Sequence, residues 1–384
     1  MKLVRPLIIP SPFVVASHQL TTSNISESEY SAWAVGTAYV VGNRVQIVDP
    51  TATVTITAAV PGVVTFTAHG LPVNSPIRIT TTGALLTGLT AGTVYYTRDH
   101  TVNTFTLSLT PGGAPLNTSG TQSGTHTAVS TRHDVYECLI NDTGSPPALN
   151  ATIWAYADAT NKWRLHNGLV SSKTSNITSI DNTYTLDGRA NSVALLAMDG
   201  ATVQVIMTDS VEGEVYNVTK SGVSSSGIID HYEWWTEDPV RITELLFEDL
   251  PSYSGATIRV IITATNETVL CGVLVIGNDL ELGCTLHGMG LSIQDFSIKQ
   301  TDAFGNTSVL ERAFKREVTA RVIADNDSVD AIFNELAKLR ARPTVYVGST
   351  DFGASMAYGF FKDFNIDVAL PTKSFISIEI EGLT

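Results

Sequence analysis

Apolar and polar positions alternate with a period of two along much of the chain, which is typical of strands that bury one face. The alternation is clearest in Phe375–Ile380, which reads FISIEI. Ser192–Met207 reads as two strands that form a hairpin around Asp199-Gly200, because this dipeptide favours a two-residue turn. Further strands are expected at Ile258–Ala264, Leu270–Ile276, Val318–Ile323 and Thr344–Val347. The pattern predicts a mainly β, multidomain fold, with short-stranded β modules and a larger β-rich body.

One segment near the C-terminus changes to helical spacing. Its apolar residues fall on one face of a helix and are Val329, Ile332, Phe333, Leu336 and Leu339. Asp325 or Asp327 can cap the N-terminal end, and Pro343 ends the segment. We therefore expect one C-terminal amphipathic helix over residues 328–340, whose apolar stripe packs on the core.

A threonine-rich window occupies residues 49–130. Within residues 51–130 there are 21 threonines and only three charged side chains. Short β-branched stretches separated by Gly and Pro turns predict a small all-β domain. The alternative is a low-complexity spacer, but the aromatic residues give the window something to bury, and they are Phe66, Tyr95, Tyr96 and Phe105.

Residues 30–48 and 131–160 flank this window and read as one interrupted module, since each segment is too short to close its own core. The module supplies four candidate carbohydrate-binding residues, which are Trp33, Tyr39, Tyr136 and Trp154. A Trp or Tyr ring at a surface can stack on the C–H face of a sugar. The alternative is that these rings form the core of a small domain without disulfides.

Two regions complete the predicted organisation. Residues 1–29 begin like a signal peptide, but three prolines among the first twelve residues disfavour a helical apolar region. We expect an extended N-terminal arm there, lying on a neighbouring surface. Residues 161–384 are expected to form a β-rich assembly body that contains the helix at 328–340.

Composition narrows the classes of function. The formal net charge is -14, which disfavours a nucleic-acid partner because phosphate neutralisation needs a basic face. With 43% hydrophobic residues, the chain as a whole is not expected to be disordered. No apolar run approaches the roughly 18 residues of a membrane span. The cysteines Cys138, Cys271 and Cys284 are too few for a disulfide framework, which favours folding in a reduced cytoplasm.

The familiar catalytic motifs are absent from the sequence, so we expect no enzyme, no cofactor and no metal site. Acids at Glu233, Glu237 and Asp238 lie beside two tryptophans, which leaves a glycosidase as an alternative. A solvated loop is the simpler interpretation of that cluster. Asp302 and Gly305 are explained by hairpin turn chemistry without a metal.

The interrupted module resembles the small carbohydrate-binding modules of the chitin-binding type 5/12 group. The residues that carry the resemblance are Trp33, Tyr39, Gly42, Val45, Tyr136, Cys138, Asn141, Gly144, Pro147 and Trp154. That group has a short turn where this chain inserts its threonine-rich window. The resemblance implies that the module binds host surface glycans.

The remaining regions resemble proteins of tailed phages. The insert is similar to a small β-domain that recurs in their virion proteins, through Ala68–Leu71, Gly83–Leu89 and Ser119–His126. The body resembles an uncharacterised phage tail protein family, through Asn161–Trp163, Asp249–Pro251, Asp295–Ser297, Arg342-Pro343 and Ile380–Leu383.

These resemblances imply a structural component of the virion tail, made in the host bacterial cytoplasm and placed in the tail tip, the baseplate or an adaptor ring. Its partners would be other copies of itself in a symmetric ring and neighbouring virion tail proteins. The alternative is a receptor-binding protein whose main task is the recognition of host surface carbohydrate. A third class is a glycan-degrading tail enzyme that uses Glu233 or Glu237.

Overall fold

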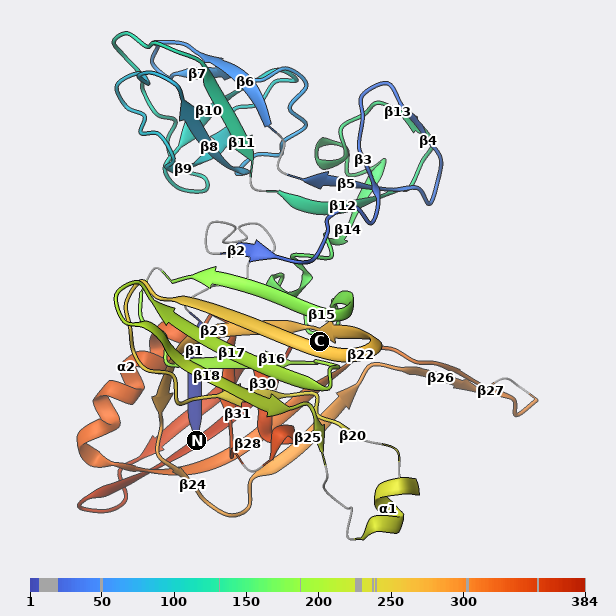
Figure 1. Ribbon diagram of the computed structural model, residues 1–384, viewed down its shortest axis with the longest axis vertical. Helices are drawn as coiled ribbons and strands as arrows, with labels where there is room; N and C mark the ends of the chain where they lie inside the picture. The colour runs from blue at the N-terminus through green and yellow to red at the C-terminus, as the bar shows by residue number, and fades with distance from the viewer. Residues whose placement is uncertain are drawn as a thin grey trace. The chain divides into compact units, whose positions relative to one another are not determined.

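The computed structural model describes residues 1–6, 20–48, 51–130, 132–186, 188–224, 230–236, 238, 240–301, 304–350 and 352–383. The fold is mainly β, as predicted (Figure 1). The chain divides into two compact units. Unit 1 holds the described residues of 1–9, 18–25 and 164–384, and unit 2 holds those of 26–163. Among the described residues, no helix is both long and apolar enough to cross a membrane.

Unit 1 is built on a ten-stranded sheet whose strands all pair antiparallel. In order across the sheet, these strands are β21 (Leu245–Phe247), β16 (Ser192–Leu196), β23 (Val273–Glu281), β1 (Lys2–Pro6), β29 (Thr344–Val347), β30 (Met356–Asp367), β31 (Lys373–Gly382), β28 (Phe314–Asp325) and β24 (Cys284–Thr285). The tenth strand, β25 (Gly290–Asp295), pairs with β28 beside β24.

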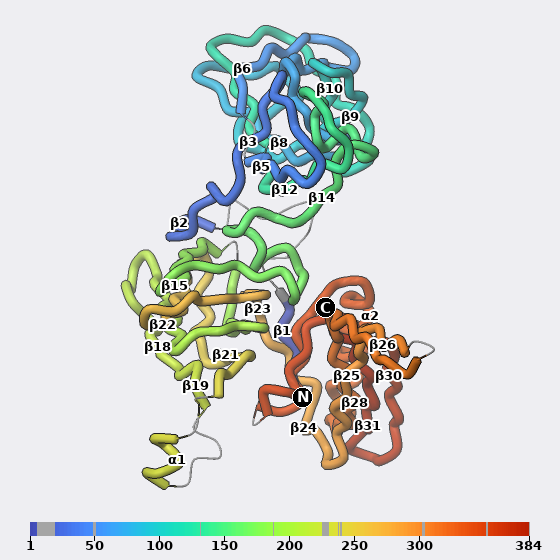
Figure 2. The backbone as a smooth tube through the Cα atoms, turned by 90° about the vertical axis from the view of Figure 1, so that its right-hand side faces the viewer, coloured from blue at the N-terminus to red at the C-terminus, as the bar shows by residue number. Residues whose placement is uncertain are grey.

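A second, five-stranded sheet belongs to the same unit. Its strands, in order, are β18 (Gly213–Ser221), β17 (Thr202–Asp209), β22 (Thr257–Cys271), β15 (Thr174–Thr185) and β2 (Leu20–Ser23). In Figure 2, β15, β18 and β22 lie on one side of unit 1, and β28, β30 and β31 lie on the other.

Short elements complete unit 1. Two strand pairs stand apart from the large sheets, β19 (Val223–Ser224) with β20 (Val240–Arg241) and β26 (Ile298–Thr301) with β27 (Thr307–Leu310). The helical segments are η2 (Arg164–His166), α1 (His231–Thr236), η3 (Asn326–Ser328), α2 (Val329–Leu339) and η4 (Gly353–Ser355).

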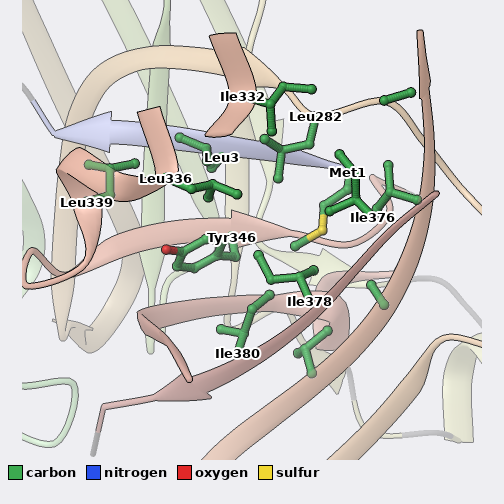
Figure 3. Close-up of a cluster of buried hydrophobic side chains, with 14 of the residues drawn as sticks. Met1, Leu3, Leu282, Ile332, Leu336, Leu339, Tyr346, Ile376, Ile378 and Ile380 are labelled. Atoms are coloured by element: carbon green, nitrogen blue, oxygen red, sulfur yellow. The ribbon is translucent and has the colours of Figure 1, made fainter. Parts of the chain in front are cut away.

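The largest core cluster of unit 1 lies between α2 and the sheet (Figure 3). Helix α2 falls within the predicted segment and buries Ile332, Leu336 and Leu339. Phe333, another residue of the stripe, stays half exposed and packs edge-on against Phe364 at 5.7 Å. The strands β31 and β28 add alternate residues to this core, which confirms the period-two reading of both segments.

The predicted hairpin at Asp199-Gly200 is wrong. The strands β16 and β17 are present, but β16 pairs with β21 and β23 while β17 pairs with β18 and β22. The connection between them carries the chain from one sheet to the other, and Ala197 adopts a positive φ of 51° within it. The cause is burial, because every residue of β16 is buried and therefore needs a neighbour on both edges.

The predicted N-terminal arm over residues 1–29 is wrong for its first residues. Lys2–Pro6 forms β1, an interior strand that pairs with β23 on one edge and with β29 on the other. Leu3 and Val4 are fully buried, so this strand contributes to the core of unit 1. Leu20–Ser23 forms β2 at the edge of the second sheet. The prolines at 10 and 12 lie outside the described residues.

Unit 2 contains the two flanking segments, which join in one four-stranded sheet. Its strands, in order, are β14 (Trp154–Ala159), β12 (His133–Cys138), β5 (Arg44–Val48) and β3 (Ser31–Ala32). A second pair, β13 (Asp142–Thr143) with β4 (Ala38–Tyr39), and the turn η1 (Pro147–Leu149) cover it. The strands β5 and β12 pair directly although the insert separates them in sequence.

The insert folds as a closed barrel with its own core. Around the barrel the strands are β10 (Thr104–Ser108), β7 (Val63–Thr65), β6 (Thr51–Ile56), β11 (His126–Ser130), β8 (Pro76–Thr81) and β9 (Val94–Arg98). Tyr95 and Phe105, two of the aromatic residues noted in the sequence, are buried inside it. Closure leaves no free strand edge in this part of the chain.

Candidate functional site

The four predicted carbohydrate-binding residues come together in a single cluster, the core of the module in unit 2. Trp154 is 1% exposed, and Tyr39 and Tyr136 are also buried. Trp33 is half-buried and packs against the same cluster. A ring needs a free face to stack on a sugar. The prediction of surface stacking is therefore wrong for Tyr39, Tyr136 and Trp154.

Hydrogen bonds fix these rings in the core. The indole Nε1 of Trp154 donates to the carbonyl oxygen of Ser145 at 3.1 Å. The hydroxyl of Tyr39 accepts from the backbone N–H of Ala34 at 2.8 Å, and the two rings meet edge to face at 5.1 Å. A small core without disulfides must bury large rings, and the polar atoms of those rings then need hydrogen-bond partners inside the module.

A buried charged group supports the same module. Arg132 donates to the carboxylate of Asp134 and to the hydroxyl of Tyr136. Burial raises the pKa of Asp134 and raises the pKa of Tyr136 to about 12, although Arg132 opposes both shifts. Tyr136 consequently stays neutral, and its hydroxyl accepts a hydrogen bond from Arg132 within the module.

The acidic cluster lies on and after α1, a short helix with no buried residues. Trp234 and Trp235 are 60% and 79% exposed and meet edge to face at 5.2 Å. Glu233 lies half-buried on the same helix, whereas Glu237 lies outside the described residues. No group of three His, Cys, Asp or Glu side chains suitable for a metal occurs in the described part of the chain.

The structure also presents an exposed apolar surface that the sequence analysis missed. We call it the hairpin surface, and it consists of β25 together with the β26–β27 hairpin that follows it. All residues of these three strands are exposed. Its large apolar side chains are Leu291, Ile293, Phe296, Ile298, Phe304, Val309, Leu310 and Phe314. The sequence feature that could have predicted this surface is the density of apolar residues on both sides of Asp302–Gly305.

The pairing of the hairpin explains why it is exposed. Ile298 lies opposite Leu310 and Thr301 lies opposite Thr307, and no third strand joins β26 or β27 among the described residues. Strand β25 likewise pairs on one edge only, with β28. A two-stranded hairpin in water is marginally stable, and an unpaired edge offers free backbone donors and acceptors. Both features favour a partner.

A cavity of about 280 Å³ opens beside the base of the hairpin. Phe314 and Arg316, at the start of strand β28, line one side of it. The rest of the lining is mostly apolar and includes Val170, Leu196, Met356, Tyr358 and Leu383. The cavity therefore offers an apolar site next to the hairpin surface.

Two polar features mark the wall of this cavity. Arg316 Nη2 lies 2.7 Å from Glu244 Oε1, and Thr243 donates to the same carboxylate at 2.6 Å. Tyr358 is buried, and its hydroxyl has no hydrogen-bond partner among the described residues. Burial raises the pKa of Tyr358, so the group stays a protonated donor.

Comparison with known proteins adds no relative to this picture. No protein-family model matches the chain, and no curated protein matches it significantly.

Proposed function

We propose that this chain is a self-assembling structural subunit of a tailed-phage virion, sited in the tail tip, the baseplate or an adaptor ring. The observation that carries the proposal is the hairpin surface. It combines an isolated hairpin, an open strand edge and eight exposed large apolar side chains in unit 1. Soluble monomers rarely expose such a surface without a use for it.

Self-assembly accounts for this surface better than catalysis or glycan binding does. Burying the hairpin surface against another copy would supply a third strand and remove apolar area from water. The assignment to a phage particle rests on the sequence resemblances of the insert and the body. Glycan binding through the four predicted aromatic residues is not part of the proposal, because Tyr39, Tyr136 and Trp154 are buried in the core and Trp33 packs against it.

The test is the mass of the purified protein in solution, by light scattering, alone and mixed with the tail proteins of its particle. We expect a defined multiple of the 41.1 kDa chain. A protein that stays monomeric at every concentration, and in the mixture, would contradict the proposal.

A further inference from the structure

The cavity beside the hairpin is suited to an apolar side chain. Its lining is mostly aliphatic and aromatic, and three of its polar side chains, Thr243, Glu244 and Arg316, are paired with one another. Water bound there would find few hydrogen-bond partners, and water needs two to four of them to be held in a buried site. A volume of about 280 Å³ has room for one large side chain.

The same chain displays a side chain of this kind. Phe304 lies between β26 and β27 at the far end of the hairpin and is 91% exposed. No other large apolar side chain among the described residues is more exposed. Figure 1 shows the hairpin extending away from the body of unit 1.

The hairpin cannot bring Phe304 to the cavity of its own chain. Its base joins β28 at Phe314, which lines that cavity, and its strands run outward from there. At about 3.3 Å per residue, the three steps from Ile298 to Thr301 along β26 carry the hairpin roughly 10 Å from its base, and Phe304 follows beyond that strand. Phe304 can therefore reach this cavity only in another copy of the chain.

We infer that Phe304 of one copy occupies the cavity of the next copy, in a head-to-tail contact. This inference rests on the proposed function, because it requires self-association. A head-to-tail contact repeated around a closing rotation gives a ring, and each subunit then contributes one Phe304 and one cavity.

A complementation experiment tests the contact. Phe304→Ser removes the inserted ring, and Ser171→Trp places an indole at an exposed position of the cavity lining. Each variant alone should lose self-association by about tenfold or more. A mixture of the two retains one intact contact, from Phe304 of the second variant to the cavity of the first, so it should form dimers of twice the chain mass and nothing larger. Phe352→Ser, at another exposed phenylalanine, is the matched control and should assemble normally.

Crosslinking provides a direct second measurement. In a Cys284→Ser background, which removes the exposed native cysteine, Thr307→Cys and Ser171→Cys chains are mixed and treated with a short bismaleimide. Both chains keep Phe304, so covalent dimers should form in this mixture and not when Phe352→Cys replaces Thr307→Cys. If both single variants keep the parent mass, or no crosslink forms, the inference is wrong while the proposed function stands. A monomeric parent contradicts the proposed function, and the inference with it.

Discussion

At the scale of single residues, burial decides what each aromatic or titratable group does. The rings of Tyr39, Tyr136 and Trp154 have the composition of a sugar platform, but the sheet of the module closes over them. Exposed aromatic rings do exist, on α1 and on the hairpin surface, where the sequence offered no family pattern. The residue types therefore identified rings that could stack on a sugar, but exposure to solvent determines which rings are able to do so.

The first prediction concerns Trp154. Trp154→Ala should destabilise unit 2 by about 3–5 kcal/mol, because it removes the largest buried ring of a small core. Urea unfolding followed by circular dichroism measures the change. Tyr156→Ala, at a more exposed ring of the same strand, is the control and should cost less. A Trp154→Ala protein of parental stability that has lost binding to a glycan would restore the stacking interpretation.

The second prediction concerns pH and His166. Burial lowers the pKa of His166 from 6.5 to about 3, and its Nε2 lies 3.0 Å from the Tyr184 hydroxyl. Between these two values the unfolded chain binds a proton that the folded chain does not. Stability is therefore fully present above pH 6.5 and falls by at most about 1.4 kcal/mol per pH unit toward pH 3.

His166→Gln isolates this contribution. The variant should show a shallower loss of stability between pH 6.5 and 3 than the parent, measured by chemical unfolding at each pH. Parallel curves for the two proteins would show that His166 is protonated in the folded state.

At the scale of elements, edges and pairings distinguish the hairpin surface from the rest of the molecule. The barrel closes on itself and has no edges, whereas β25 leaves one edge open next to an isolated hairpin. Natural sheets usually protect such edges with charges or short strands. In β25 the exposed side chains include Leu291 and Ile293, so this edge is suited to pairing.

The third prediction tests this edge. Ile293 is 66% exposed, so Ile293→Lys should change stability by less than about 0.5 kcal/mol, as expected for a surface substitution. It should nevertheless reduce the oligomer mass, because a lysine on an edge strand disfavours pairing. Ile177→Lys, at an exposed isoleucine of β15, is the control and should leave the mass unchanged. Equal masses for both variants and the parent would exclude β25 from the interface.

At the scale of the whole molecule, the insert is a self-contained domain within the module. Val48 at the end of β5 pairs with His133 at the start of β12, so the two ends of the insert lie side by side. The barrel core draws only on residues of the insert. Such an arrangement lets two cores coexist in unit 2 without sharing residues.

The fourth prediction follows from these adjacent ends. Replacing residues 49–132 with Asn-Gly should leave a folded module, since this dipeptide closes a two-residue hairpin. Asp134→Asn should accompany the replacement, because its buried partner Arg132 is lost. Cooperative unfolding monitored by tryptophan fluorescence measures the result. Loss of that transition would show that the module depends on the barrel.

Sequence patterns predicted the elements far better than their partners. The helix at 328–340, the strand at Phe375–Ile380 and the β character of the insert follow from local periodicity, and the structure has all three. The Asp199-Gly200 hairpin and the N-terminal arm failed because pairing is set by distant residues. The hairpin surface was missed because periodicity identifies the apolar face of a strand. It does not say whether another part of the same chain packs against that face.

The interior position of β1 has a consequence for how the molecule is made. Residues 2–6 leave the ribosome long before their neighbours in β23 and β29, so one edge of this segment stays unpaired until residue 347 has been synthesised. The large sheet is also continuous only through this strand. A protease that clipped these few residues would divide the sheet into two halves, so a cut near one end of the chain would weaken the middle of the body.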